Sequence, residues 1–499
     1  MSERKRVTSA HVASDGVTDV DVVVLGVGTC GEDLSLQLLD AGLDVVGIEA
    51  TLVGGECAYW ACIPTKMMIR AANLLQEARR VDGMAGHAEV TADWAPVAAR
   101  IRAEATSGWD DSFAVARFAE RGGRLVHERG KLAGPRTVTV GDQSFRARRG
   151  VVIATGSEPA IPPIPGLADV DYWTSHDVIR AEKLPQSMIV IGGGGVGCEL
   201  GQVLARFGVA VSVVEASDRL LQAEEPEASK VVEAAFAAEG IEVHTGAVVQ
   251  RVGSGDGSIV VTLANGEELT GERLLVATGR ATDLSDLGLE AAGLDSAARF
   301  IPVDERMHAA DGIWAMGDVT GKAFFTHVAV HQAAIIAADI LGEDHSPARY
   351  DAVPRTTLTD PELGAVGMTE ADALAAGLDT VVAVKQLPAT IRGWLHGSRS
   401  GIIKLIADRK TGVLVGATAA GPQAGEMLGL LTLAVHARVP LSELRSMIYA
   451  FPTFYGGIGE AVGAYGRGVT TVIDPMYRGF ESLDTVGTSE RADERDAAG

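Results

Sequence analysis

Residues 20–31 read VDVVVLGVGTCG, an apolar run that is followed by glycines at positions 26, 28 and 31. The run predicts a buried strand that ends in a tight turn, and residues 32–41 then read as a helix. Glycines in such a turn let the backbone approach a pyrophosphate, which the helix N-terminus attracts. A second strand, residues 44–49, ends in an acid where a ribose-binding carboxylate is expected. The pattern predicts a dinucleotide site with binding residues Gly26, Gly28, Gly31 and Glu49.

The same order of elements returns in the middle of the chain. Residues 188–197 read MIVIGGGGVG, a helix is expected over about 198–207, and a strand over 210–215 ends in Glu215. Glu215 would accept a hydrogen bond from a ribose 2′-hydroxyl and would repel a 2′-phosphate, so NADH is expected in preference to NADPH. The second site is predicted to use Gly192, Gly194, Gly197 and Glu215.

Two of the four cysteines lie close to the first unit, in the stretch GGECAYWACIPTK of residues 54–66. Cys57 and Cys62 are five residues apart, and Pro64 can open a helix just after Cys62. Lys66 follows Cys62 by four residues, so the two side chains would share one helix face. A helix N-terminus and a cation both favour a thiolate. The stretch therefore indicates a redox dithiol, with two ordinary buried cysteines as the alternative.

The composition excludes several other classes of function. The chain has 499 residues, 47% of them hydrophobic, which predicts about three globular domains. Its net charge of -23 argues against a nucleic-acid partner, because phosphate binding needs clustered Lys and Arg. No apolar run of about 18 residues and no signal-peptide core are present, so no membrane partner and a cytoplasmic location are expected. Four cysteines are too few for a secreted disulfide scaffold, and no metal site is predicted.

Three further motifs follow the dithiol in order: IATGS at residues 153–157, VATGR at 276–280 and IWAMGD at 313–318. With the glycine turns and the dithiol, they resemble the pyridine nucleotide-disulfide oxidoreductases, the family of lipoamide dehydrogenase, glutathione reductase and mercuric reductase. The resemblance implies an α/β fold with two Rossmann-like three-layer nucleotide-binding domains and a C-terminal α+β dimerisation domain. The expected parts are a disordered N-terminus 1–18, an FAD-binding domain 19–165 with a return segment 289–347, an NAD(P)-binding domain 166–288, a dimerisation domain 348–475 and a tail 476–499.

The resemblance also implies an FAD- and NAD(P)H-dependent enzyme that is a homodimer and reduces a small-molecule acceptor. By family position, electrons pass from NADH through FAD to the Cys57–Cys62 disulfide, Cys62 faces the flavin, and Cys57 attacks the acceptor. Lys66 would stabilise the negative charge of the reduced flavin, and Glu199 matches the acid that pairs with this lysine. The remaining cofactor-binding positions are Gly55, Thr155, Gly156, Gly279 and Asp318, the last of which binds the flavin ribityl chain in the family.

The chain departs from the family pattern near its C-terminus. Members that reduce disulfides carry a His-Pro-Thr-x-x-Glu pattern, where residues 449–456 of this chain read YAFPTFYG. Phe451 stands at the position of the proton-shuttling histidine, so general acid–base help is missing from its usual place. Tyr449 and Tyr455 flank Phe451 and are candidate donors near the dithiol of the partner chain, with aromatic packing at the interface as the alternative.

Other positions are less easily interpreted. In the redox stretch Glu56 replaces a usual threonine, and residues 59–61 are bulkier than in the family, which would reshape the acceptor pocket. His327 and His331 lie one turn apart on the helix expected after Asp318 and read as interface or capping residues. His396 has no assigned place.

The missing histidine leaves several acceptors open. A reactive disulfide, a persulfide or a small electrophile would need little protonation of its leaving group. A metal ion, as in mercuric reductase, needs thiolates but no proton shuttle, although no cysteine follows residue 475. Direct transfer from the flavin to a quinone, a dye or dioxygen is a third route. A flavin- and NAD-binding sensor without turnover is the non-enzymatic alternative.

Overall fold

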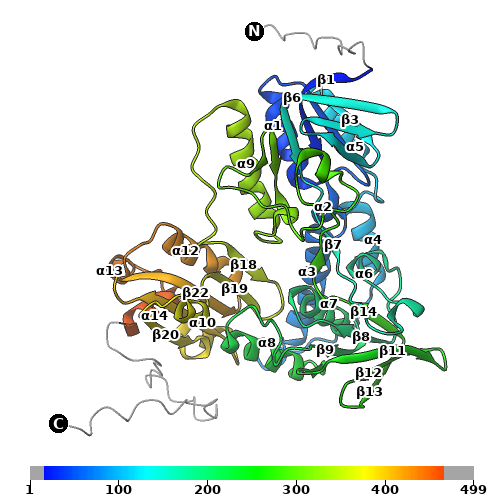
Figure 1. The fold of residues 1–499 in the computed structure, drawn as a ribbon. Coiled ribbons are helices and arrows are strands. Elements are labelled where there is room, and N and C mark those ends of the chain that lie inside the picture. The colour runs from blue at the N-terminus through cyan, green and yellow to red at the C-terminus, as the bar shows by residue number, and fades with distance from the viewer. Residues whose placement is uncertain (1–15, 466–499) are drawn as a thin grey trace.

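The computed structural model describes residues 16–465, which form three lobes (Figure 1). The sheet that contains β1 (Thr18–Leu25) lies at one end of the molecule, and the sheet that contains β8 (Ser187–Ile191) lies at the other. The C-terminal sheet, which begins with β18 (Pro354–Thr357), lies beside the second one. The predicted tail 476–499 and nearly all of the predicted N-terminal segment 1–18 fall outside the described residues.

The first sheet is mainly parallel, in the order β16-β17-β6-β1-β2-β3. Leu25 pairs with Ile48 on one side and with Ile153 on the other, so the carboxyl ends of these strands meet at one edge. The valines of β1 are buried, as expected for a parallel sheet that is covered on both faces. The other strands are β2 (Val45–Glu49), β3 (Arg124–His127), β4 (Gly130–Gly134), β5 (Thr137–Val140), β6 (Gln143–Ile153), β16 (His308–Ala310) and β17 (Ile313–Ala315).

The helices of the first lobe have bounds that differ from those predicted from the sequence. The helix after the first turn, α1 (Thr29–Asp40), starts inside the glycine turn, because Gly28 is extended and is the N-cap. It packs against α9 (Thr326–Leu341). The region 67–130, expected to be helical, is only partly so, and it ends in β3 and the start of β4. Its helical elements are the end of α3 (Cys62–Arg79), α4 (Ala95–Arg100), a π-helical turn (Ile101–Ala105) and α5 (Ser112–Glu120).

The second sheet repeats the parallel arrangement, in the order β10-β9-β8-β14. Ile191, at the end of β8, pairs with Val214 and with Val276, so a second set of carboxyl ends meets at one edge. Its helix α7 begins at Gly195, again within the glycine turn. The elements of this lobe are α6 (Ser175–Arg180), α7 (Gly195–Arg206), α8 (Pro226–Ala238), β9 (Ala210–Val214), β10 (Glu242–His244), β11 (Val249–Gly255), β12 (Ser258–Leu263), β13 (Glu268–Gly271) and β14 (Arg273–Val276), with β7 (Glu158–Pro159) and β15 (Arg280–Ala281) pairing at its border.

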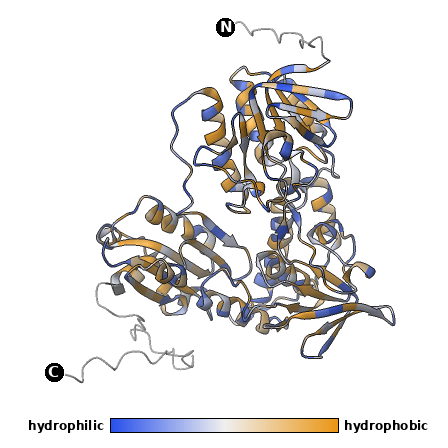
Figure 2. Ribbon diagram, in the orientation of Figure 1, coloured by the Kyte–Doolittle hydropathy of each residue, from blue (hydrophilic) through white to orange (hydrophobic). Residues whose placement is uncertain are grey.

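The C-terminal lobe is an antiparallel sheet in the order β18-β19-β22-β21-β20, with helices packed on it. The predicted hairpin is β21 (Ile402–Asp408) and β22 (Val413–Gly421). Figure 2 shows hydrophobic residues concentrated along the strands of this sheet and of the two parallel sheets. The remaining elements are β19 (Glu362–Gly367), β20 (Thr380–Gln386), α10 (Glu370–Ala375), α11 (Ile391–His396), α12 (Ala424–His436), α13 (Leu441–Ser446) and α14 (Gly456–Tyr465). The predicted fold class, two Rossmann-like units and an α+β C-terminal domain, is confirmed.

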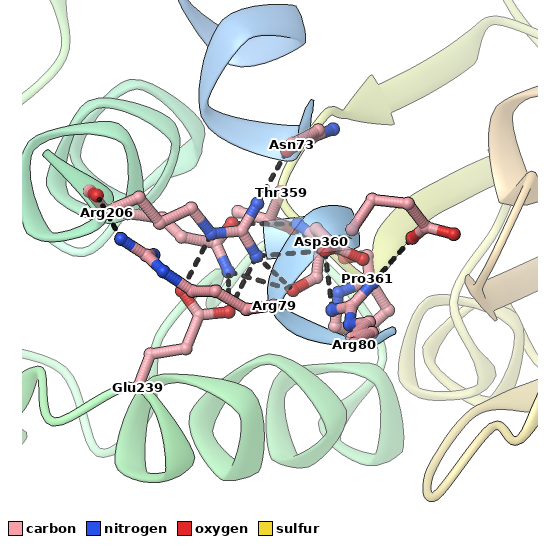
Figure 3. Close-up of polar contacts among 10 residues, drawn as sticks. Asn73, Arg79, Arg80, Arg206, Glu239, Thr359, Asp360 and Pro361 are labelled. Atoms are coloured by element: carbon pink, nitrogen blue, oxygen red, sulfur yellow. Dashed lines mark hydrogen bonds and ion pairs between the residues drawn. The ribbon is translucent and has the colours of Figure 1, made fainter. Parts of the chain in front are cut away.

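A buried ionic junction ties α7 to the C-terminal lobe (Figure 3). Arg206, whose side chain is 2% exposed, contacts Glu239 at 2.6 Å and Asp360 at 2.9 Å. Gln202 donates to the backbone carbonyl of Asp360 and accepts its N–H, both at 2.8 Å. Arg80, just past the end of α3, contacts the same carboxylate at 2.7 Å. The junction thus holds α3 and α7 against the loop that precedes β19.

Among residues 16–465, no helix combines the length and the apolar character needed to cross a lipid bilayer.

Candidate active site

One large cavity connects the two parallel sheets. It has a volume of about 1550 Å³, larger than a typical ligand pocket, and reaches the glycine turns of both nucleotide units. The redox stretch with Cys57 and Cys62 lies on its wall, as do Lys66 and Asp318. The structure therefore brings the predicted nucleotide turns and the dithiol to one continuous space.

The first glycine turn has the backbone that its glycines predict. Gly26 has a φ of +95°, and a Cβ on Gly31 would lie 2.2 Å from the carbonyl oxygen of Gly26, so the turn and the helix need both glycines. A Cβ on Gly28, which lies on the cavity wall, would instead meet only the Cα of Gly55, at an ordinary contact distance of 3.9 Å. The carboxylate of Glu49 accepts the N–H of Val27 at 2.7 Å, which fixes it at the end of β2. The helix N-terminus can bind a diphosphate and the fixed carboxylate can bind a ribose hydroxyl, so the two fit the adenosine diphosphate part of FAD.

The second turn repeats these relations. Gly192 has a φ of +110°, and a Cβ on Gly197 would lie 1.9 Å from the carbonyl oxygen of Gly192. A Cβ on Gly194 would meet no atom within 4 Å and would project into the cavity. Glu215 accepts the N–H groups of Gly193 at 2.6 Å and Ser217 at 2.7 Å. The residues fit a second dinucleotide in the same way as the first.

The remaining predicted cofactor positions also lie on the cavity wall. Gly55 packs on the first turn, where a Cβ would come within 2.8 Å of the Cα of Gly28. Thr155, Gly156 and Gly279 lie in the two loops that follow β6 and β14. Asp318 accepts a hydrogen bond from the hydroxyl of Ser157 at 2.5 Å, and burial raises its pKa.

The two thiols of the redox stretch are unequal. A hydrogen bond from Cys57, together with one from the Thr326 hydroxyl and the charge of Lys66, lowers the pKa of Cys62 to about 6. The Thr326 hydroxyl lies 3.4 Å from Cys62 Sγ. The pKa of Cys57 is raised, because this thiol is the hydrogen-bond donor to Cys62 and is partly buried. Cys62 is therefore the thiolate of the pair, and Cys57 retains the proton.

Lys66 and Glu199 are brought together from different lobes. Lys66 Nζ lies 2.8 Å from one carboxylate oxygen of Glu199, and the other oxygen accepts the backbone N–H of Leu358 at 2.7 Å. Glu199 belongs to the same face of α7 as Gln202 and Arg206. The ionic junction in Figure 3 therefore holds the loop that orients Glu199, and Glu199 holds Lys66 one helical turn after Cys62.

A cluster that no sequence motif indicated surrounds Glu56. His176 Nε2 lies 2.8 Å from its carboxylate, and Arg280 Nη2 lies at the same distance. The ring of His176 stacks on Trp60 with centroids 4.8 Å apart, and the guanidinium of Arg180 lies 4.3 Å from the Trp60 ring. The sequence shows the departures at positions 56 and 60 but not their partners. His176 and Arg180 come from α6, and Arg280, which closes the VATGR motif, is the first residue of β15.

Two more residues at the dithiol were missed. Thr326 begins α9 directly after the predicted Asp318 motif, and its hydroxyl contacts Cys62 while its carbonyl oxygen lies 3.6 Å from Cys30 Sγ. Cys30, in the first glycine turn, is a third thiol on the cavity wall, and burial raises its pKa to about 12. The only sequence signal for either residue is its place beside a recognised motif.

The predicted C-terminal residues lie within the C-terminal lobe. The hydroxyl of Tyr449 donates to the carbonyl of Leu444 at 2.9 Å, and that of Tyr455 accepts the N–H of Ala450 at 3.0 Å. Their rings lie 5.9 Å apart and pack on the core of this lobe. Phe451, beside them, is 78% exposed. In this single chain neither phenol reaches Cys57, so their role toward a partner's dithiol stays a prediction.

Of the other three histidines noted in the sequence, His327 lies on the cavity wall, whereas His331 and His396 do not. His327 Nε2 bonds to the carbonyl of Pro354 at 2.9 Å, and His331 is exposed on α9. His396 packs edge-on against Phe454 at 5.3 Å. Among residues 16–465, no group of three histidine, cysteine or acidic side chains has the geometry to hold a metal ion.

Two family profiles match the chain, one over its N-terminal part and one over its C-terminal part. Residues 20–333 match the profile of the family described as pyridine nucleotide-disulphide oxidoreductase, and residues 353–462 match the profile of the dimerisation domain of that family.

Individual relatives cover nearly the whole chain. A mercuric reductase from Bacillus cereus is 30% identical over 469 residues, which are 93% of this chain and 74% of the relative. A dihydrolipoyl dehydrogenase from Thermus scotoductus is 33% identical over 461 residues, 89% of this chain and 97% of the relative. Among solved structures, a Cu(II) complex of the HOCl-induced flavoprotein disulfide reductase RclA from Escherichia coli superposes with a TM-score of 0.79 at 26% identity, covering 89% of this chain and 99% of the other.

Proposed function

Because this chain belongs to the pyridine nucleotide-disulfide oxidoreductases, enzymes that use FAD and NAD(P)H, we propose that it passes electrons from NADH to the Cys57–Cys62 pair and on to a small, reactive acceptor. The family, the enzyme class and the two cofactors predicted from the sequence are confirmed. The chain also carries the dimerisation domain of the family, which supports a homodimer. The observation that carries the proposal is the unequal thiol pair on the wall of a cavity that both nucleotide turns reach.

Different residues of the cavity have different roles in the proposed reaction. When bound, FAD supplies two-electron transfer between the nicotinamide and the disulfide. The first turn and Glu49 would bind its adenine half, and Asp318 its ribityl chain. Lys66, held by Glu199, keeps a positive charge beside the thiolate of Cys62. Cys57, which retains its proton until it is activated, is the thiol that meets the acceptor.

Phe451 limits the kind of acceptor that the enzyme can reduce. Phe451 cannot carry a proton, so a leaving group receives none from the place where the family keeps its histidine. We therefore propose a reactive disulfide, a persulfide or a small electrophile, whose leaving group departs readily, rather than lipoamide or glutathione disulfide.

The preference for NADH follows from Glu215 and Arg219. The carboxylate of Glu215 is fixed by two backbone N–H groups at the end of β9, where it opposes a 2′-phosphate. The guanidinium of Arg219 is already engaged, because its Nη2 donates to the carbonyls of Gln222 at 2.6 Å and Glu224 at 3.1 Å and its Nη1 lies 3.4 Å from the carboxylate of Asp218. Replacing Glu215 by Gln should lower the ratio of kcat/KM for NADH over NADPH by about 10-fold or more, equivalent to about 1.4 kcal/mol. An unchanged ratio would contradict this preference.

The test of the function is an anaerobic titration with NADH followed by an acceptor screen. We expect a yellow protein whose flavin is reduced by NADH and which consumes NADH steadily with an aromatic disulfide or a persulfide. Cys57→Ser should abolish this consumption, whereas Cys198→Ala, a buried thiol bonded to the Gly193 carbonyl, should retain it. A colourless protein, or a Cys57→Ser variant with full activity, contradicts the proposal.

Reduction of a metal ion is the second candidate. It is favoured by the mercuric reductase relative and by the thiol pair of Cys57 and Cys62 on the cavity wall. Adding Hg(II) and Cu(II) to the same screen separates the two functions, because a metal-ion reductase would consume NADH with these ions and not with disulfides. Activity with quinones that survives Cys57→Ser would instead indicate direct transfer from the flavin.

A further inference from the structure

The loop of residues 219–225, which follows β9, packs on the second glycine turn. The backbone N–H of Leu221 donates to the carbonyl of Gly193 at 2.8 Å, and a Cβ on Gly193 would come within 2.5 Å of the Leu220 side chain. Leu221 has a φ of +50°, in the left-handed region that a leucine rarely adopts. Such a conformation persists only where the surrounding structure holds it, and it is common at ligand sites. Loop 219–225 is thus kept in a strained form by its neighbours.

The C-terminal lobe holds this loop through a forked ion pair. Arg355, on β18, has its Nε and Nη2 each 2.9 Å from one of the two carboxylate oxygens of Glu224. The two side chains are 24% and 10% exposed. Glu224 is tied to the strained residue, because its backbone N–H donates to the carbonyl of Leu221 at 2.8 Å. Next to it, Glu225 pairs with Lys404 of β21 at 2.8 Å, and both of these side chains are 2% exposed. Two ion pairs therefore fix the end of the loop to the C-terminal lobe.

The strand β18 also touches the other side of the glycine turn. Thr357, at the end of the strand, lies beside the first residue of α7, since a Cβ on Gly195 would be 3.5 Å from the threonine hydroxyl. The next residue, Leu358, donates its N–H to Glu199 of α7 at 2.7 Å. Both Thr357 and Leu358 line the cavity that the turn reaches. Together with its ion pair to loop 219–225, β18 thus contacts both segments that flank the turn.

We propose that Arg355 is a positioning residue for NADH: through Glu224 it fixes loop 219–225, and hence the second glycine turn, in the form that binds the dinucleotide. The inference rests on the proposed function, because it takes NADH as the electron donor at this turn. Arg355 acts through the loop, since its guanidinium already donates to Glu224 and, through Nη1, to the carbonyl of Gly367 at 3.3 Å. The C-terminal lobe thereby contributes to nucleotide binding.

Loss of the ion pair should weaken NADH binding without changing the steps that follow. When the carboxylate of Glu224 no longer holds the loop, the glycine turn adopts other conformations as well, and only the fraction in the native form binds the nucleotide. The thiols and the first glycine turn belong to the first lobe. The FAD content and the rate of flavin reduction at saturating NADH should therefore stay as they are.

The experiment measures NADH affinity and flavin reduction separately. In anaerobic stopped flow of the FAD-containing protein, the dependence of the flavin reduction rate on NADH concentration gives both the Kd and the limiting rate. Arg355→Gln should raise this Kd about 10-fold or more, while the limiting rate and the bound FAD stay as in the wild type. Arg355→Lys keeps the charge but not the fork, so its Kd should lie between the two. Arg251→Gln, which removes an exposed ion pair with Glu268 in the second lobe, is the matched control and should leave the Kd unchanged.

A double variant tests whether Arg355 acts through Glu224. Glu224→Gln should raise the Kd for NADH as Arg355→Gln does. Because the two residues form one unit, the combined variant should bind NADH no more weakly than either single variant. Two independent contributions would instead multiply, as substitutions at unconnected sites do. This comparison distinguishes the ion pair from a general effect of changing either side chain.

The outcomes separate the inference from the proposed function. An unchanged Kd in Arg355→Gln, or multiplied losses in the double variant, would overturn the role of Arg355 and leave the proposed function intact. A raised Kd accompanied by loss of FAD would indicate general disruption of the lobes and would also overturn it. A wild type whose flavin is not reduced by NADH would overturn NADH as the donor, and the inference with it.

Discussion

Unequal surroundings, not unequal chemistry, distinguish Cys57 from Cys62. Both thiols are partly buried, and burial opposes ionisation of each. Cys62 gains hydrogen bonds from Cys57 and Thr326 and the charge of Lys66, whereas Cys57 gives its proton to the hydrogen bond. The dithiol spacing and the lysine were visible in the sequence. Thr326 was not, because it is 264 residues from Cys62 and meets it only in the folded chain.

This asymmetry can be tested by removing the donor. In Cys57→Ala the pKa of Cys62 should rise from about 6 toward its ordinary value, because the thiolate loses its largest stabilising contact. Alkylation of the reduced protein by iodoacetamide, measured as a function of pH, reports the thiolate. The wild-type rate at Cys62 should fall only below about pH 6, and the variant rate should fall at higher pH. Cys198→Ala should leave the Cys62 profile where it is, and coincident profiles for Cys57→Ala and the wild type would show that Cys57 is not the donor.

At the scale of elements, one face of α7 joins the active site to the C-terminal lobe. Glu199, Gln202 and Arg206 are spaced by three and four residues, and each contacts the loop that precedes β19. The helical spacing is readable in the sequence. The contact of all three side chains with one loop could not be read from the sequence. The loop is more than 150 residues away, and it is bound through its backbone groups as often as through its side chains.

The junction makes a prediction about stability. Asp360→Ala leaves Arg206, which is 2% exposed, with one carboxylate partner fewer, and breaking a buried pair typically costs about 3–5 kcal/mol. Urea denaturation should therefore show a free energy of unfolding lowered by about 3 kcal/mol. Arg102→Ala, which removes an exposed ion pair with Glu182, should cost less than about 1 kcal/mol. A loss for Asp360→Ala no larger than that of this control would mean that the junction is not stabilising.

The two glycine turns make a prediction about binding. A Cβ on Gly28 or Gly194 meets no close atom of the protein, so each alanine variant should fold, but the added methyl group would occupy the cavity at the helix N-terminus. Gly28→Ala should therefore purify with less FAD, and Gly194→Ala should retain FAD while its Kd for NADH rises at least 10-fold, about 1.4 kcal/mol. Flavin absorbance and isothermal titration check the two effects. Full nucleotide binding by both variants would rule out these turns as the contact points.

At the scale of the whole molecule, the dimerisation domain leaves apolar side chains uncovered in the single chain. Ile448 is 94% exposed and Phe451 is 78% exposed, and both belong to the short segment between α13 and α14. Apolar surface of this kind on a domain of this family is consistent with a partner subunit.

The homodimer is tested by charging this surface. Ile448→Asp should convert a dimer to a monomer in sedimentation velocity, because a buried carboxylate without a partner opposes association. Val248→Asp, a 53% exposed valine in the second lobe, is the matched control and should sediment as the wild type does. A monomeric wild type, or a dimeric Ile448→Asp, would contradict the proposed interface.

The sequence by itself determined the parts that depend on short-range order. Two strand–glycine turn–helix units and a dithiol with a lysine one turn later follow from contiguous residues, because turns, helix faces and buried strands are local requirements of the backbone. The fold class followed from the resemblance of the ordered motifs to the family. The tertiary structure decided which distant groups complete them: Thr326 and Cys30 at the dithiol, Leu358 on Glu199, and His176 and Arg280 on Glu56. Cys30 and Arg280 stand in motifs that the sequence shows, but none of these contacts could be predicted, because the partners are far apart along the chain and meet only in the folded structure.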